Sequence, residues 1–397
     1  MVLRPLDIVP TKDCCGCEAC ANICPKDCIS MQPDEQGFVR PHFDEEACIH
    51  CDLCRKACPI LNDKAIGVNP KVMACKNRNN SVRATSSSGG VFTAIAEPVI
   101  ADGGCVYGAA FNHNLEVEHI RIDTIGDLAR LRGSKYVQSR VGDCFARSKE
   151  DLRSGKAVLF TGTPCQIAGL RSYLGKSYDN LYCIEVVCHG VPSPAVFRHY
   201  ISTLEQQHGA KVISFNFRDK VESWQRYSLS AQFDNGTTMR QRGAENPFQR
   251  GFIADLYTRP SCTACRFKQF ASGADLTLGD FWGSGIFGAE YNDDRGISLV
   301  CINSSKGELL FERAQKGLFD VRTSTLEEAT LFNPCVVRST TMHPKSKQFW
   351  QAYRNEDFGT LVTRLLHVPA WKIRLKSLPA YAKAAVKKIT NVCLRRK

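Results

Sequence analysis

Eight cysteines near the N-terminus have the types and spacing of iron–sulfur ligands. The run C-x2-C-x2-C-x3-C-P occurs twice, ending at Pro25 and at Pro59. In runs of this kind three cysteines bind one 4Fe-4S cluster and the fourth binds the other cluster. We therefore predict two cluster sites, which are the first site of Cys14, Cys17, Cys20 and Cys58, and the second site of Cys48, Cys51, Cys54 and Cys24.

The alternatives for these cysteines are zinc knuckles and disulfide bonds. Zinc sites pair two C-x2-C units, whereas this chain has triplets followed by an offset cysteine–proline pair. The spacing is that of a bacterial two-cluster ferredoxin, which carries single electrons. Cys15 and Cys28 have no place in the pattern, and we expect them to be bystanders.

Four further cysteines stand at predicted loop positions, namely Cys165, Cys188, Cys262 and Cys265. The first two follow predicted strands, and the last two form a C-x2-C unit. Four convergent thiolates would make a metal or cluster site, but their spacing alone does not choose zinc over 4Fe-4S. Cys183 is a competing ligand, although its place in an apolar strand favours a buried thiol.

Length, cysteine content and charge set the class of protein. The chain has 397 residues and 21 cysteines, and the opening MVLRPLDIVPTKD lacks the apolar region of a secretory signal. We therefore expect a reducing compartment, the cytoplasm, and no membrane span. The formal charge is +12, but no zinc finger or basic stripe with interleaved aromatics is present, so we expect no nucleic-acid partner.

The elements that must position the later cysteines alternate between strand, small-residue loop and helix. Strands are expected at 72–75, 157–160, 181–187 and 297–303, each followed by a helix. Segment 211–217 and a hairpin around Asn235 and Gly236 add antiparallel strands. The predicted fold is an α+β ferredoxin-like two-cluster domain followed by an α/β domain with a mixed sheet.

These patterns divide the chain into four parts. We expect a ferredoxin domain at 1–64, a linker at 65–71, an α/β domain at 72–340 and a basic, partly helical C-terminal tail at 341–397. The tail is expected to be a solvated helix pair. Its alternative role is docking to an anionic membrane surface or an acidic redox partner through Trp371 and the lysines.

A series of motifs resembles the family of beta subunits of coenzyme F420 hydrogenases and dehydrogenases. The motifs are SSSGG (86–90), GSKYVQS (133–139), GTPCQIAGL (162–170), CHGVPS (188–193), and CTACRF with ADLTLGDFWG (274–283). The resemblance covers about 72–340 and implies FAD, a 4Fe-4S cluster on the four later cysteines, and hydride exchange with a 5-deazaflavin, coenzyme F420. Reductases of chlorophyll-type substrates look similar and use reduced ferredoxin as donor.

The same resemblance implies which residues lie against FAD. They are Ser87, Ser88, Gly89, Gly90, Lys135, Tyr136, Gln138, Gly162, Thr163 and Gln166. Backbone N–H groups of the SSSGG loop, which precedes a helix, are suited to a pyrophosphate. Lys135 would neutralise phosphate or the reduced ring, and Tyr136 or Gln138 would pack on it or hydrogen-bond to it. The alternatives are a flexible loop for SSSGG and a solvated cation for Lys135.

Two residues are candidates for acid–base chemistry. His189 follows a candidate ligand and is expected to donate a hydrogen bond to cluster sulfur rather than transfer a proton. Asp280 is expected to be structural, capping a turn or pairing with Arg266.

The sequence therefore predicts an iron–sulfur flavoprotein oxidoreductase that relays electrons between 4Fe-4S clusters and FAD. Its organic partner would be a deazaflavin or another hydride acceptor, and its protein partner a redox protein or ferredoxin. Two alternatives stay open. One is a ferredoxin-dependent reductase of a carbohydrate or lipid intermediate, and the other is a non-enzymatic electron-transfer subunit of a larger complex.

Overall fold

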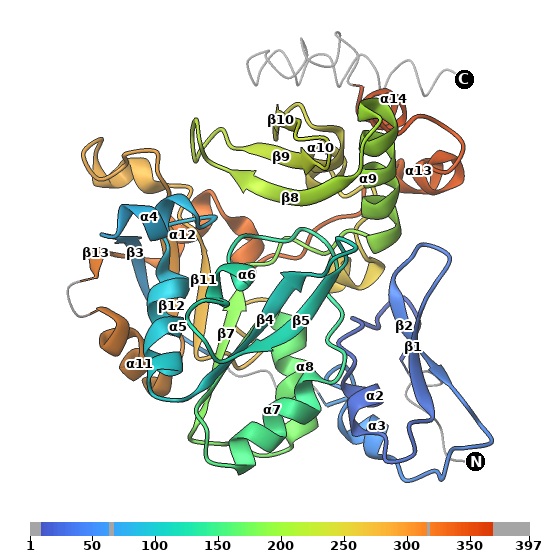
Figure 1. The fold of residues 1–397 in the computed structure, drawn as a ribbon. Helices are drawn as coiled ribbons and strands as arrows, with labels where there is room; N and C mark the ends of the chain where they lie inside the picture. Colours follow the sequence, from blue (N-terminus) through green and yellow to red (C-terminus); the bar gives the residue numbers. More distant parts are fainter. Residues whose placement is uncertain (1–8, 63–66, 316–317, 368–397) are drawn as a thin grey trace, which may run out of the picture.

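The structure is a computed structural model that describes residues 9–62, 67–315 and 318–367 (Figure 1). Its N-terminal part holds the two cysteine runs. Short helices α2 (Ala19–Ile23) and α3 (Leu53–Lys56) flank an antiparallel hairpin of β1 (Ile29–Pro33) and β2 (Val39–Phe43). This ferredoxin module lies beside the larger α/β body, with its hairpin next to helix α9 (Pro194–His208) (Figure 1).

The α/β body is built on an eight-stranded mixed sheet, as predicted. Its order is β13-β3-β12-β11-β7-β6-β4-β5. Strands β4, β6, β7 and β11 run parallel, and β5, β12 and β13 pair antiparallel with their neighbours. The strand bounds are β3 (Lys71–Asn77), β4 (Cys105–Phe111), β5 (Val117–Ile122), β6 (Val158–Gly162), β7 (Leu181–Val186), β11 (Leu276–Asp280), β12 (Ser298–Ile302) and β13 (Phe319–Ser324).

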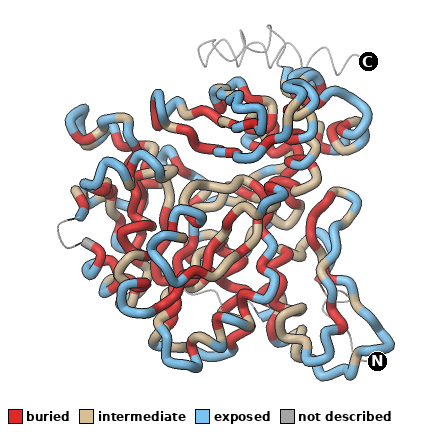
Figure 2. The backbone as a smooth tube through the Cα atoms, in the orientation of Figure 1, coloured by how far each residue is buried: buried red, intermediate tan, exposed pale blue. Residues whose placement is uncertain are grey.

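Helices cover both faces of this sheet. One face carries α5 (Val91–Ala101) and α11 (Ser305–Gln315), whose apolar residues share a core with the central strands. The opposite face carries α7 (Cys144–Arg153) and α8 (Pro164–Leu174). The strands between these layers are mostly buried, as Figure 2 shows by their red colour. Near-continuous apolar runs such as 158–160 follow from this two-sided burial.

The predicted hairpin around Asn235 forms, but it lies outside the large sheet. Strands β8 (Val212–Asp219), β9 (Ser228–Phe233) and β10 (Thr238–Arg242) make a separate three-stranded antiparallel sheet. Helices α9 and α10 (Pro247–Ile253) pack with it through Phe197, Phe215 and Phe248. The large sheet is mixed because of β5, β12 and β13, and not because of this hairpin as the sequence suggested.

The expected domain boundary at residue 340 is also wrong. Helices α13 (Ser346–Ala352) and α14 (Phe358–Leu366) belong to the same core as α9 and the three-stranded sheet. Phe349, Phe358 and Leu361 are each at most 1% exposed, so this part of the expected tail is structural. Trp371 and the basic residues after it lie outside the described residues.

The remaining described elements are short connections: α4 (Asn80–Ala84), α6 (Leu128–Leu131), α12 (Leu326–Leu331), and the 3₁₀ turns η1 (Pro260–Ala264), η2 (Ser284–Phe287) and η3 (Pro334–Val336). Among the helices within the described ranges, none is long and apolar enough to cross a membrane.

Candidate iron–sulfur and cofactor site

The second predicted cluster site forms a small cavity at the surface of the ferredoxin module. Cys24, Cys48, Cys51 and Cys54 all line this cavity of about 30 Å³. Cys51 is exposed, so this site is the one that faces solvent. Cys28, expected to be a bystander, lines the same cavity, with its sulfur 3.3 Å from that of Cys24. It is therefore a neighbour of the site and not remote from it.

The first predicted cluster site lies deeper. Cys17 is buried, and Cys14, Cys20 and Cys58 are partly buried. Burial raises the pKa of Cys20 and of Cys58, and the nearby Cys14 thiol raises both further. Cys20 and Cys58 also interact electrostatically with Cys54 of the second site, so the two sites are neighbours. The structure thus brings each predicted set of four cysteines together, and their role as ligands stays a prediction.

The duplicated sequence produces a duplicated backbone. Gly16 and Glu18, which flank Cys17, have φ of 67° and 66°. The equivalent residues of the second run, His50 and Asp52, have φ of 53° and 61°. A positive φ is uncommon in residues other than glycine. Because it recurs on both sides of the second cysteine of each run, it is a property of the ligand loop.

The four later cysteines also meet around one space. Cys165, Cys188, Cys262 and Cys265 line a cavity of about 110 Å³. We call this space the third site. Its thiols surround a volume instead of meeting at a point, and within the described ranges no group of three or more His, Cys, Asp and Glu is close enough for a single metal ion.

Separate elements deliver these four thiols. Cys165 lies in the first turn of α8, where Thr163 and Gln166 form a capping box. Cys188 follows β7, Cys262 lies in η1, and Cys265 ends that turn. Burial raises the pKa of Cys262 to about 12, and hydrogen bonding to Cys15 together with burial raises the pKa of Cys165. Iron ligation needs thiolates, which burial disfavours. The positive charge of the iron ions in a bound cluster would stabilise these thiolates.

Cys15 is not a bystander, because it links the two modules. It hydrogen-bonds with Cys165 and lines the third site, together with Asp13 and Ile60 of the ferredoxin module. Its neighbour in the chain, Cys14, belongs to the first site. A single peptide therefore joins a first-site cysteine to a residue that touches the third site.

Three cations line the third site, namely Arg259, the exposed Arg266 and Lys268. Lys268 donates through its Nζ to the carbonyl oxygen of Cys188 and, at 2.6 Å, to that of Cys335. Arg259 lines the same cavity and is 0% exposed. Cations near thiolate-ligated clusters stabilise their negative charge.

His189 lies at the third site but does not use its Nε2 on sulfur. This atom is 3.0 Å from Oδ1 of Asp255. Asp255 also accepts hydrogen bonds from Thr258 and Thr340. The carboxylate therefore orients the imidazole, and the expectation that His189 donates a hydrogen bond to a cluster sulfur stays a prediction.

Asp280 pairs with Arg218 and not with Arg266. Its Oδ2 is 2.9 Å from Nη1 of Arg218, and its Oδ1 accepts from Nε1 of Trp224 at 3.0 Å. Arg266 instead donates to the carbonyl oxygen of Ile60. Arg218 lies between the rings of Tyr227 and Trp282, 4.1 and 4.8 Å from their centroids. An arginine buried among aromatic rings holds the Asp280 carboxylate in place.

The three segments assigned to FAD lie side by side. The amide of Ser134 donates to Oγ of Ser87 at 2.6 Å, which joins SSSGG to GSKYVQS. The side chain of Gln166 donates to the carbonyl oxygen of Ser139, which joins GSKYVQS to GTPCQ. We call these three segments the flavin ledge.

Many ledge groups already have partners in the protein. The Gly89 amide donates to Oγ of Ser298 at 2.9 Å, and Ser88 Oγ donates to the carbonyl of Ile297. An added Cβ at Gly89 would lie 2.4 Å from the Cys75 oxygen, so this glycine serves close packing on the sheet. Gly90 caps α5 with φ 82° and has no side chain to bind a ligand. The expectation that the Gly89 amide cradles a pyrophosphate is therefore not met.

The polar side chains of the ledge are similarly engaged. Lys135 Nζ donates to the carbonyls of Arg130, Leu131 and Arg132, so it closes the end of α6 and is not a solvated cation. Burial lowers the pKa of Lys135 to about 7. Gln138 accepts from Arg259 and from the amide of Val39, so it faces the ferredoxin module. Gln166 closes the capping box next to Gly162.

Tyr136 contacts a buried arginine that carries an unsatisfied donor. Its hydroxyl accepts from Nη1 of Arg218 at 3.2 Å, and Arg218 also reaches the Ser87 carbonyl. In the part of the chain that the structure describes, Nε of Arg218 is buried without a hydrogen-bond partner. Buried donors normally find a partner, so this group marks a place for an acceptor.

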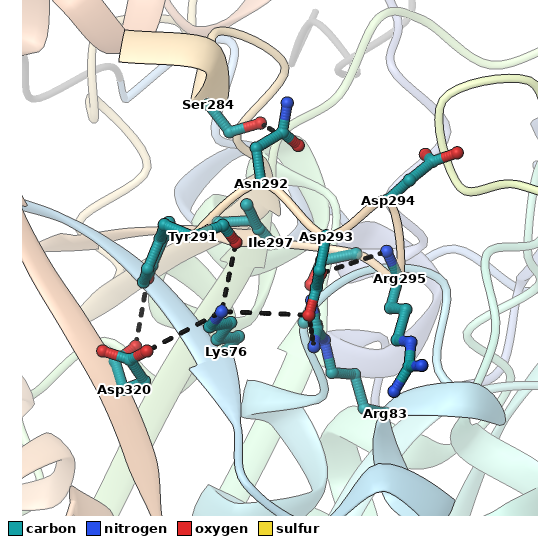
Figure 3. A network of polar contacts seen from close by, with 12 residues as sticks. Lys76, Arg83, Ser284, Tyr291, Asn292, Asp293, Asp294, Arg295, Ile297 and Asp320 are labelled. Carbon is teal, nitrogen blue, oxygen red and sulfur yellow. Dashed lines mark hydrogen bonds and ion pairs between the residues drawn. The ribbon is translucent and has the colours of Figure 1, made fainter. Parts of the chain in front are cut away.

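A polar network clamps the loop that closes this region. Arg83 donates to Asp293 at 2.7 Å and to the carbonyl of Gly296, and Lys76 contacts Asp293 and Asp320 (Figure 3). Gly296 packs against Ser88, so the clamp fixes loop 291–297 against the SSSGG loop. SSSGG is therefore an ordered turn, and not the flexible loop of the alternative interpretation.

Sequence reasoning missed Arg218, Arg259 and Lys268, and it dismissed Cys15. Arg259 and Lys268 flank the SCTAC motif, so their proximity to Cys262 and Cys265 was a usable signal. Arg218 lies in the strand segment FNFRDK, and no pattern in that segment indicates a contact with Asp280, 62 residues away.

Comparison with known proteins identifies both modules. Residues 13–61 match the 4Fe-4S dicluster domain. Residues 155–325 match a family described as the C terminus of the beta subunit of coenzyme F420 hydrogenase/dehydrogenase. The family resemblance predicted from the motifs is confirmed.

Individual relatives match only in part. One of the subunits of the F420H2 dehydrogenase of Methanosarcina mazei is 24% identical over 178 residues, covering 42% of this chain and 49% of that protein. A polyferredoxin-like protein of Methanocaldococcus jannaschii is 37% identical over 57 residues, covering 12% of this chain and 34% of its own length. The chain thus spans about half of the first relative.

Among solved structures, a chain of the F420-reducing [NiFe] hydrogenase complex from Methanosarcina barkeri superposes with a TM-score of 0.47. It is 17% identical, and the match covers 69% of this chain and 89% of that chain.

Proposed function

This chain is a relative of the beta subunits of coenzyme F420 hydrogenases and dehydrogenases with an N-terminal 4Fe-4S dicluster domain, and from that premise we propose that it is an iron–sulfur flavoprotein oxidoreductase. In this proposal electrons pass one at a time along three clusters, and FAD exchanges them as a hydride with a deazaflavin. FAD, when bound, supplies the conversion between one-electron and two-electron steps.

The observation that carries the proposal is the cavity of the third site, which both modules line. Its four thiols come from the α/β body, while Cys15, Asp13 and Ile60 come from the ferredoxin module. The first site adjoins this cavity through Cys14, and the second site adjoins the first through Cys54. The order is therefore a second site at the surface, a first site that is largely buried, and a third site at the boundary between the ferredoxin module and the α/β body.

The flavin ledge supports the second half of the proposal. The residues that would hold FAD are Arg218, whose Nε has no hydrogen-bond partner among the described residues, and Tyr136 and Ser87, which its guanidinium contacts. A buried guanidinium stabilises an anionic ring or a phosphate group. Asp280 would keep this guanidinium in position.

A second candidate is an electron-transfer subunit whose organic substrate binds elsewhere in a complex. This alternative is favoured by the relative from M. mazei, because that protein is itself named as one of the subunits of a dehydrogenase. In that case the chain would carry clusters and pass single electrons without a substrate of its own.

Anaerobic reconstitution tests the proposal. We expect about twelve irons, from three 4Fe-4S clusters, and one FAD per chain. Adding reduced deazaflavin should bleach the flavin absorbance. Bleaching by reduced ferredoxin only would favour the ferredoxin-dependent reductase, and three clusters without flavin would favour the electron-transfer subunit. About eight irons with a tightly held zinc would contradict the third cluster.

A further inference from the structure

Arg259 is a completely buried cation at the boundary between the two modules. It is 0% exposed, and it precedes the turn η1 that carries Cys262. Its own amide donates to the carbonyl of Val191 at 2.9 Å, so its backbone is anchored to the segment after Cys188. The base of this side chain therefore belongs to the third site.

The guanidinium of Arg259 reaches into the ferredoxin module. Its Nε donates to the carbonyl of Cys14 at 2.9 Å, and Nη2 donates to that of Val39 at 3.1 Å. Nη2 also lies 4.0 Å from the sulfur of Cys14. Nη1 donates to Oε1 of Gln138 at 2.9 Å. The charged end is thus placed beside the first site, while its stem borders the third.

This buried charge has no carboxylate partner. All the oxygen acceptors of Arg259 are uncharged, and within residues 9–62, 67–315 and 318–367 no Asp or Glu forms an ion pair with it. Burial raises the pKa of Glu18 and the charge of Arg259 opposes that rise, but the Glu18 carboxylate accepts its hydrogen bonds from the amides of Val141 and Gly142. Burying an unpaired guanidinium costs several kcal/mol, so such residues almost always have a counter-charge.

The missing negative charge is available at the two neighbouring cysteine sites. A 4Fe-4S cluster with four thiolates is anionic and gains a further negative charge on reduction. The field of Arg259 reaches Cys165 and Cys262 of the third site, and its Nη2 is next to Cys14 of the first. One fixed cation therefore lies within reach of both candidate clusters.

We propose that Arg259 is the shared counter-charge of the first and third clusters, and that it positions the two modules for electron transfer while raising both reduction potentials. The proposal rests on the proposed function in that both sites must hold clusters. Loss of the cation disfavours the more negative, reduced state of each cluster. Removing it therefore lowers both potentials and leaves the more distant second cluster less affected.

The local packing indicates that this arrangement is specific to arginine. A Cβ added at Gly16 would lie 2.9 Å from both Nη1 and Nη2 of Arg259 and 2.6 Å from the Gln138 amide nitrogen. The loop between Cys14 and Cys17 is thus shaped around the planar guanidinium. A lysine keeps the charge but lacks the fork that bonds Cys14, Val39 and Gln138 together.

The test compares Arg259→Gln with Arg266→Gln in the full-length, reconstituted protein. Arg266 is exposed, follows Cys265 directly and also bonds the ferredoxin module, through Ile60, so it is a matched loss of charge. Redox titration followed by EPR should show that Arg259→Gln lowers the equilibrium constant for reducing the first and third clusters about tenfold, or about 59 mV. Arg266→Gln should change it much less, because solvent screens an exposed charge.

A second variant separates charge from folding. Arg259→Lys should retain potentials close to those of the unsubstituted protein while the ferredoxin amides exchange faster with solvent. Three results would overturn the proposal. The reduction potentials could be unchanged in Arg259→Gln, they could shift equally in Arg259→Gln and Arg266→Gln, or they could shift as far in Arg259→Lys as in Arg259→Gln. If Arg259→Gln does not assemble, the Lys variant decides through both measurements: ferredoxin amides that exchange at the normal rate, or equilibrium constants for reduction lowered by the full factor of about ten, would overturn the proposal. An unsubstituted protein with eight irons would refute the third cluster, yet the effect on the first would still be measurable.

Discussion

At the residue scale, the third site is surrounded by buried ionisable groups that the cysteine pattern does not reveal. Glu185 on β7 is 3% exposed and accepts hydrogen bonds from Ser272 and, at 2.7 Å, from Thr277. Burial raises the pKa of Glu185 to about 7, and its charge reaches Cys265. Such a carboxyl group makes the stability of the α/β body depend on pH.

The sign of that dependence follows from the two protonation states. The ordinary pKa of the side chain is 4.5, so between pH 4.5 and about 7 the folded protein binds a proton that the unfolded chain has lost. Stability therefore falls as pH rises through this window. Glu185→Gln should abolish this loss, which is on the order of 3 kcal/mol at full ionisation.

Thermal unfolding midpoints at pH 5 and pH 8, measured anaerobically, check this prediction. The midpoint of the unsubstituted protein should drop more between the two pH values than that of Glu185→Gln. Glu290→Gln, which changes an exposed carboxylate, serves as the control. Parallel pH profiles for the Glu185→Gln and unsubstituted proteins would show that this carboxyl group titrates alike in both states.

At the scale of the element, helix α8 delivers a cysteine from its first turn. Oε1 of Gln166 accepts from the amide of Thr163 at 3.0 Å and from its hydroxyl at 3.1 Å, and Thr163 Oγ1 lies 3.2 Å from the sulfur of Cys165. A capping box fixes the entry of the chain into a helix. The position of Cys165 therefore depends on the cap as well as on the sheet.

Thr163→Ala should loosen the third site selectively. Losing a threonine cap costs about 1 kcal/mol and frays the turn that holds Cys165. We expect chelator to remove iron faster from the third site, with the ferredoxin iron released at its normal rate. Helix α12 offers the matched control, because Thr325 and Glu328 form a second capping box in a helix that carries no cysteine. Equal iron release from Thr163→Ala and Thr325→Ala would show that the α8 cap does not support the site.

At the scale of the whole molecule, the ferredoxin module is tightly docked and not tethered by a linker alone. Its hairpin packs on the start of α9, where Ser193 donates to the carbonyl of Gln36. Arg354, after α13, donates to the carbonyl of Glu35. Glu18 and Asn22 bond the loop before α7. Electron transfer between the modules requires such fixed proximity, so docking is part of the proposed function.

Gly37→Ala should weaken this docking. A Cβ at Gly37 would lie 2.3 Å from Cβ of Ala195, and its φ of 81° is unfavourable for alanine. Hydrogen exchange should show faster labelling of β1 and β2 and unchanged labelling of β6 and β7. Gly155→Ala is the matched control, since it has φ 87° but no atom within 4 Å of the added Cβ. Unchanged exchange in the hairpin of Gly37→Ala would mean that this contact does not hold the module.

The sequence by itself determined the cysteine sets, the family and the alternation of strands and helices. These features depend on short spacings, because ligand loops and apolar runs are encoded within a few neighbouring residues. It placed β6, β7, β8 and β12 within about one or two residues of their observed bounds. It did not anticipate β4 and β5, nor the packing of α13 and α14 into the core.

Only the tertiary structure decided which polar groups are free and which charges meet. Lys135, Gln138 and Gly89 look like ligands for FAD in the motifs, but the fold engages their nitrogen atoms or carbonyl oxygens within the protein. Arg259 meets Cys14 across 245 residues, a contact that no local pattern encodes. The physical reason is that burial obliges each polar group to find a partner, and the partner is whichever group the folded chain brings near.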